Sequence, residues 1–159
     1  MTPEEYREQL GGIVGNFHAL EFLLRGFLQS LPAARPIGIP HGTDIYSFPV
    51  GTKLPENELT SYDSLGLLIT KFNNEMAKRG LPQIDSTLVE IRDAVAHGRV
   101  SAHTKQGYLR LLKFDKPENR RVCVTFNEEL TEAWFTKHTR RIFAAIESVA
   151  RQAGAKIEP

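Results

Sequence analysis

The sequence has only one cysteine, Cys123, among its 159 residues, and one cysteine cannot form a disulfide within the chain. Long apolar runs are also absent, because Asn16, His18, Glu21 and Arg25 interrupt the most apolar stretch, residues 13–31. Such a stretch does not predict a membrane span. The first ten residues carry three glutamates and no apolar run, unlike a secretory signal. We therefore expect a cytoplasmic protein with no membrane partner.

A large net charge is lacking too, since the formal value is +1, but the charges are unevenly distributed. Residues 92–121 hold eight lysines and arginines against three acidic residues, whereas residues 1–91 hold seven against eleven. A basic block of this kind favours a polyanionic partner. A solvated hairpin surface would give the same pattern, and the charge count does not separate the two interpretations.

Internal repeats and low-complexity segments are not apparent. Hydrophobic residues make up 41% and charged residues 25% of the chain, which is typical of soluble globular proteins. The length suits one domain with a core of its own. We therefore expect residues 1–159 to form a single domain.

Hydrophobic spacing of threes and fours predicts four helices, over residues 3–31, 57–79, 82–97 and 127–154. Thr2 is the expected N-cap of the first helix, and Asn127 that of the last. Five prolines in residues 32–56 predict an irregular loop between the first two helices.

The hydrophobic period changes to two after residue 100. Residues 108–114 and 121–126 alternate as strands do, and the residues between them predict a hairpin with a turn at 117–119. The expected fold is therefore mainly α, with a hairpin in segment 100–126 before the last helix. The simplest arrangement of the four helices is a bundle.

The residues best suited to chemistry lie at the end of the third predicted helix, in the run IRDAVAHG. Arg92 and His97 are about 140° apart around the helix axis and roughly 7.5 Å apart along it, so they do not share a face. Either Gly98 releases the helix end and the imidazole turns toward Arg92, or two copies bring one arginine to the other's histidine across a two-fold axis.

This pair of residue types suits cleavage of a phosphodiester. Histidine titrates near neutrality and can take a proton from a ribose 2′-hydroxyl. Arginine offers a planar cation that grips a phosphate and stabilises the charge of the transition state. Such a reaction needs RNA and no cofactor. We expect no metal either, because the spacing of His18 and Glu21 has no second histidine–carboxylate pair elsewhere.

The run containing Arg92, Asp93 and His97, flanked by Ala96 and Gly98, resembles the signature of the HEPN superfamily. Its ribonuclease members carry an arginine, often followed by a polar residue, and a histidine after four to six further residues. The resemblance implies a four-helix bundle core and a homodimer with the motif at the interface. It also implies metal-independent RNA cleavage, often by toxins or phage-defence factors. The loop 32–56 and the hairpin 100–126 are not part of the minimal bundle.

In the enzyme hypothesis His97 transfers the proton, Arg92 holds the phosphate and Asp93 orients one of them. Glu21 is the expected buried partner of Arg92. The residues expected to attract the RNA backbone are the basic ones of the hairpin region: Arg99, Lys105, Arg110, Lys113, Arg120 and Arg121.

Two other interpretations of the same residues remain open. Arg92 could simply pair with a carboxylate, and His97 could serve as a cation at the negative end of the helix. The chain would then be a non-catalytic module that binds a protein or a nucleotide. If it is a toxin, an antitoxin protein is a further expected partner.

Overall fold

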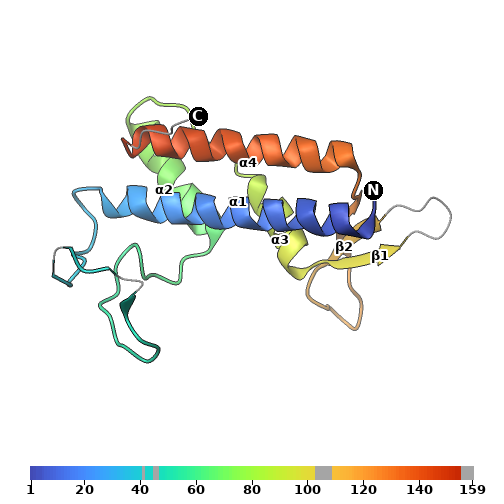
Figure 1. Ribbon diagram of the computed structural model, residues 1–159, viewed down its shortest axis with the longest axis horizontal. Helices are drawn as coiled ribbons and strands as arrows, with labels where there is room; N and C mark the ends of the chain where they lie inside the picture. The colour runs from blue at the N-terminus through green and yellow to red at the C-terminus, as the bar shows by residue number, and fades with distance from the viewer. Residues whose placement is uncertain (41, 45–46, 103–108, 155–159) are drawn as a thin grey trace.

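The computed structural model describes residues 1–40, 42–44, 47–102 and 109–154. These residues form four helices and a three-stranded antiparallel sheet (Figure 1). The predicted fold class, mainly α, is confirmed. In chain order the elements are α1 (Pro3–Gln29), α2 (Leu65–Lys78), α3 (Leu88–His97), β1 (Arg99–Ala102), β2 (Leu109–Phe114), β3 (Val124–Glu129) and α4 (Glu132–Gln152).

Helix α1 begins where the sequence predicted. The Thr2 hydroxyl accepts a hydrogen bond from the Glu5 amide, and the Glu5 carboxylate accepts one from the Thr2 amide. This reciprocal capping satisfies two amides that the helix itself leaves unpaired. The apolar stripe of α1 is buried, and it comprises Ile13, Phe17, Leu20, Leu24, Phe27 and Leu28.

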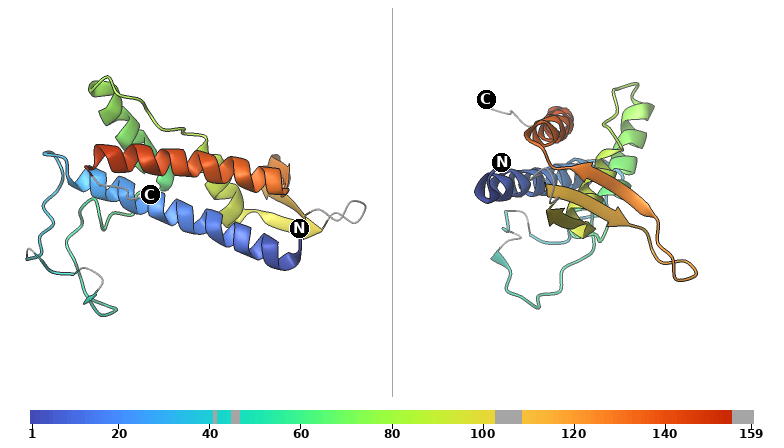
Figure 2. Two further views of the ribbon diagram at one scale, coloured as in Figure 1. Left: turned by 45° about the horizontal axis from the view of Figure 1, so that its top comes forward. Right: turned by 90° about the vertical axis from the view of Figure 1, so that its right-hand side faces the viewer.

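Helices α1 and α4 are long neighbours that run side by side in the same direction (Figures 1 and 2). Helices α2 and α3 pack across them, and the sheet lies at the end where α1 and α4 begin. One hydrophobic core joins the four helices to Leu111 of β2. None of the described helices is long and apolar enough to cross a membrane.

The predicted start of the second helix at residue 57 is wrong, since α2 begins after its N-cap Ser64. The guanidinium of Arg25 donates to the carbonyls of Ser61 and Asp63, at 3.0 and 2.8 Å. The side-chain oxygen of Asn57 accepts bonds from the amides of residues 59 and 60. These bonds hold residues 57–63 in turns, where hydrophobic spacing alone predicted helix.

The predicted start of the third helix at Pro82 is also too early, since α3 begins at Leu88. Asn73 of α2 pairs with both backbone groups of Ile84, accepting from its amide and donating to its carbonyl, each at 2.9 Å. Asp85 then accepts from the amide of Thr87. Residues 82–87 are therefore irregular because another helix occupies their backbone groups.

The sheet is larger than the predicted hairpin, because Arg99–Ala102 adds β1 as an edge strand beside β2. The tight turn lies at Asn119 and Arg120, which both have positive φ, rather than at 117–119. Strand β3 continues to Glu129, so Asn127 is not a helix cap. Helix α4 starts instead after Thr131, whose hydroxyl accepts from the Trp134 amide.

Gly98 joins α3 to the sheet at very close range. A Cβ atom at this position would lie 2.3 Å from the carbonyl oxygen of Ala94 and 2.6 Å from a methyl of Leu111. Only glycine fits there without displacing backbone. The end of α3, and with it His97, is therefore fixed against β2.

Candidate functional site

Arg92 lies in a row of four side chains of alternating charge that crosses from α1 through α3 to β2. Its Nε is 3.6 Å from Oε1 of Glu21, and its Nη1 is 3.2 Å from Oδ1 of Asp93. The other oxygen of Asp93 lies 3.6 Å from Nζ of Lys113. We call Glu21, Arg92, Asp93 and Lys113 the charged row.

The contact expected between Glu21 and Arg92 is present, but Glu21 is half-buried rather than buried, with 22% of its side chain exposed. Arg92 keeps 33% of its side chain exposed. Ion pairs this accessible contribute little to stability, about 1 kcal/mol or less. The two carboxylates therefore orient the guanidinium without sealing it from solvent.

A small pocket of about 150 Å³ opens beside Arg92, between α1 and α3. Val14, Phe17, His18 and Glu21 line it from α1, and Arg92, Val95 and Ala96 line it from α3. The pocket brings exposed His18 near Arg92, which the sequence analysis did not foresee. The only signal for it was the spacing of three residues between His18 and Glu21.

His97 faces a different pocket, of about 260 Å³, between the end of α3 and the hairpin. Its other lining residues are Arg99, Phe114, Asp115, Pro117 and Val122. His97 is exposed, and Gly98 continues in extended backbone with its amide bonded to Ala94 at 2.7 Å. The chain thus leaves the helix toward β1.

Within one chain, therefore, Arg92 and His97 do not share a pocket. The turn of His97 toward Arg92, one of the two expected arrangements, is not what the structure has. The crowding at Gly98 explains this, because β2 holds the helix end in place. The other expected arrangement, the meeting of two copies, involves a second chain.

The six basic residues expected to bind RNA are not equivalent. Arg110 donates to Glu129 at 2.5 Å and to Asn127 at 2.8 Å, and Lys113 belongs to the charged row. Lys105 lies outside the described residues.

Arg99, Arg120 and Arg121 have no carboxylate within ion-pair distance in the described part of the chain. Their side chains lie at the exposed end of the sheet and in the tight turn. The guanidinium of Arg99 sits over the ring of Phe114, 5.4 Å from its centroid. Of the expected RNA-binding residues that the structure describes, these three are the most readily available to an anionic ligand.

His138 of α4 lies in a contrasting environment. It is 1% exposed, and its ring centroid is 4.5 Å from that of Trp134. The pKa of His138 is lowered to about 4, chiefly by burial and secondly by the charge of nearby Arg141, while Glu128 acts in the opposite direction. Arg141 contacts Nδ1 of His138 at 3.1 Å and also binds Asp85 at 2.6 Å. Near neutral pH this imidazole is therefore an uncharged part of the core.

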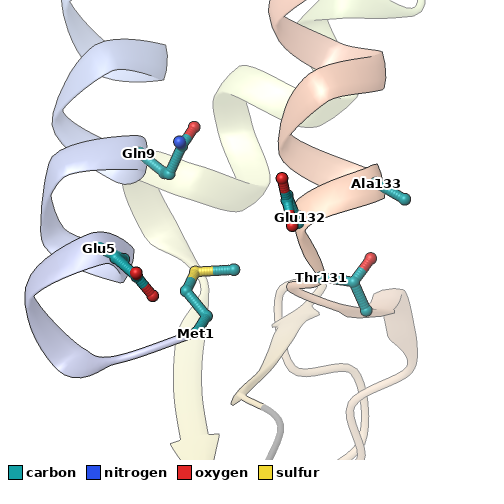
Figure 3. A pocket seen from close by; sticks show the side chains of 6 residues that line it. All are labelled: Met1, Glu5, Gln9, Thr131, Glu132 and Ala133. Carbon is teal, nitrogen blue, oxygen red and sulfur yellow. The ribbon is translucent and has the colours of Figure 1, made fainter.

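A further pocket, of about 590 Å³, lies between the first turns of α1 and α4 (Figure 3). Met1, Glu5 and Gln9 line one side, and Thr131, Glu132 and Ala133 line the other. Its two charged side chains are both acidic, and Glu5 and Thr131 are engaged in helix capping. The pocket offers nothing that matches phosphate chemistry.

Comparison with known proteins gives no match: no family model, no curated protein and no solved structure is similar to this chain. Functional inference therefore depends on the site residues and their geometry.

Proposed function

We propose that this protein is a metal-independent endoribonuclease of the HEPN type. In this proposal the four helices correspond to the bundle core of that superfamily. Arg92 holds the scissile phosphate, and His97 takes the proton of the ribose 2′-hydroxyl, whose oxygen attacks the phosphorus. The bond from phosphorus to the 5′-oxygen breaks, and the leaving oxygen takes the proton back from His97. The reaction leaves a 2′,3′-cyclic phosphate.

The observation that carries the proposal is the accessibility of both residues at the end of α3. Arg92 is held by two carboxylates yet is one-third exposed, and exposed His97 shares its pocket with Arg99. Buried His138, only 1% exposed, is not accessible to a substrate in this way.

We further propose that the active form is a homodimer in which Arg92 of one subunit works with the partner's His97. Such a dimer would bring together Arg92 and His97, which do not share a pocket within one chain. Val14, 36% exposed, lines the Arg92 pocket, and Phe22, 54% exposed, directly follows the lining residue Glu21 on α1. An apolar face beside the site fits coverage by a second copy.

The dimer is tested by placing a charge on that face. Phe22→Asp should convert the dimer to a monomer in light scattering and abolish cleavage together. Phe143→Asp is the matched control, since Phe143 is similarly exposed, at 47%, but lies on α4. A wild-type monomer at micromolar concentration would overturn this arrangement.

The catalytic proposal is tested with purified protein and mixed RNA in EDTA. Wild type should cut RNA, spare DNA and 2′-O-methyl RNA, and leave cyclic phosphate ends. His97→Ala and Arg92→Ala should each reduce the rate by about 10²–10⁴-fold, whereas Arg140→Ala on the exposed side of α4 should not. Loss of cutting in EDTA, or equal cutting of DNA, would contradict the mechanism.

One observation favours a second candidate, a non-catalytic module that binds a protein or a nucleotide. Arg92 already contacts two carboxylates, which a phosphate would have to displace. If well-folded wild-type dimer cuts no RNA, this candidate replaces the enzyme. If the enzyme is confirmed, a role as a toxin or phage-defence factor predicts growth arrest on expression, relieved by a neighbouring antitoxin gene.

A further inference from the structure

The pocket at His97 combines features that suit a planar ligand. Phe114 of β2 lines it with a half-buried phenyl ring, and the guanidinium of Arg99 lies over that ring. Val122, 49% exposed, and Pro117 add apolar surface from the hairpin loop. A phenyl ring and a guanidinium plane are the two side-chain surfaces on which unpaired nucleobases stack.

The wall of this pocket is held in place by the hairpin. Oδ1 of Asp115 accepts a hydrogen bond from the amide of Cys123 at 2.7 Å. The tight turn at Asn119 and Arg120 then folds residues 115–122 back beside the strand ends. The pocket is thus built by the hairpin segment, which the minimal bundle lacks.

The charges at this pocket suit the base of a nucleotide and its phosphate at different places. The Asp115 carboxylate lines it and would repel a phosphate, but it does not oppose an uncharged base. Three cations have no carboxylate within ion-pair distance in the part of the chain that the structure describes. Arg99 lines the pocket, and Arg120 and Arg121 lie in the same hairpin loop as the lining residues Pro117 and Val122. This arrangement favours a base inside the pocket and the backbone along its basic edge.

We propose that this pocket is a nucleobase-binding subsite for single-stranded RNA, in which Phe114 and Arg99 stack the base next to the phosphate on which His97 acts. The position of the phosphate depends on the proposed ribonuclease function, whereas the stacking does not. The substrate class that follows is unpaired RNA, since a base inside a duplex cannot enter the pocket.

The test compares two fluorescently labelled, uncleavable octamers by anisotropy at low salt. One is a 2′-O-methyl oligoadenylate, and the other has the same backbone and charge without bases. The full-length wild-type protein should bind the base-bearing strand about 10-fold more tightly, since stacking of one base contributes on that order.

Phe114→Leu keeps an apolar side chain but removes the aromatic face. It should weaken binding of the base-bearing strand about 10-fold and change binding of the base-free strand by less than twofold. Arg99→Lys keeps the positive charge but removes the planar guanidinium. It should also weaken binding of the base-bearing strand selectively, but by a smaller factor than Phe114→Leu does. The matched controls are Phe143→Leu and Arg140→Lys on α4, which should alter neither strand.

Equal losses on both strands, no loss with Phe114→Leu, or no wild-type binding of the base-bearing strand would each overturn the subsite. A thermal melt of each variant excludes unfolding as the cause. If wild type does not cut RNA but base-dependent binding requires Phe114, the subsite stands and the catalytic proposal fails. If wild type cuts RNA and Phe114→Leu leaves KM unchanged, the subsite fails and the catalytic proposal stands.

Discussion

The carboxyl end of α3 and the first half of α4 each carry a histidine, and the two side chains differ in almost every respect. His97 is exposed at a pocket beside Arg99. His138 is 1% exposed, packs on Trp134 and has a pKa lowered to about 4, chiefly by burial. The comparison teaches that burial can remove an imidazole such as His138 from proton exchange near neutral pH.

The largest expected effect on stability separates these two positions. His138→Ala should lower the free energy of unfolding by about 2–4 kcal/mol, because it leaves a cavity beside Trp134 and strands the Arg141 contact. His97→Ala should change it by about 0.5 kcal/mol or less, as exposed positions do. Urea unfolding at pH 7 measures both, and similar values for the two variants would break the comparison.

The pH dependence of stability should also come from the buried histidine. In the folded protein its pKa is about 4 instead of 6.5, so the unfolded chain binds a proton first as the pH falls. The stability contributed by neutral His138 is fully present above pH 6.5 and is lost as the pH falls toward 4, by up to about 3 kcal/mol.

Urea unfolding between pH 7 and 4 should therefore show that the free energy of unfolding falls less steeply with pH in His138→Gln than in wild type. Protonation of carboxylates affects both proteins equally and does not contribute to this difference. The charged groups around the ring are Arg141 and Lys137 on α4 and Glu128 on β3. His97→Gln is the matched control and should keep the wild-type slope. A wild-type slope in His138→Gln would show that the ring is not the titrating group.

Gly98 extends the comparison, because it directly follows the exposed His97 but is closely surrounded by other atoms. Gly98→Ala would bring its Cβ within 2.3 Å of a backbone oxygen and 2.6 Å of Leu111. We expect a loss of about 1–3 kcal/mol and reduced cleavage, since the end of α3 must move away from β2. Gly12→Ala in α1 is the control, because nothing lies near its Cβ position, and it should be neutral or stabilising.

The smallest effect is expected in the charged row. Glu21→Gln removes one partner of Arg92 but leaves Asp93, so the stability should fall by about 1 kcal/mol or less. If Glu21 competes with a phosphate for the guanidinium, the variant should bind RNA at least as tightly as wild type. Weaker RNA binding with unchanged stability would show instead that Glu21 orients Arg92 productively.

The sequence predicted those parts of the fold whose causes are local. The start of α1 follows from Thr2, Pro3 and Glu5, and its buried stripe follows from hydrophobic period. The helix starts at 57 and 82 were wrong because Arg25 and Asn73, distant in sequence, bind the backbone there. No local pattern in residues 57–63 or 82–87 reveals those partners.

Strand β1 and the start of α4 were missed for a related reason. Strand β1, Arg99–Ala102, has only four residues and all of them are exposed, so it buries no face and its alternation is too short to identify a strand. Asn127 looks like a helix cap, but Arg110 holds it and Glu129 in the sheet, and Thr131 caps α4 instead.

For the candidate site, the sequence predicted the residue types and the Glu21–Arg92 contact. It did not predict that Arg92 and His97 open into separate pockets, nor that Phe114 lies under Arg99. These are consequences of how the end of α3 meets the sheet at Gly98, and such a packing detail is not encoded in residue spacing.

Trp134 is the only tryptophan of the chain, and this gives the protein a built-in optical reporter. Its indole N–H donates to Glu128, and its ring lies against His138. All tryptophan emission therefore originates within one buried cluster that joins α4 to β3. The intensity and wavelength of the Trp134 emission will report protonation or opening of that cluster without any added label.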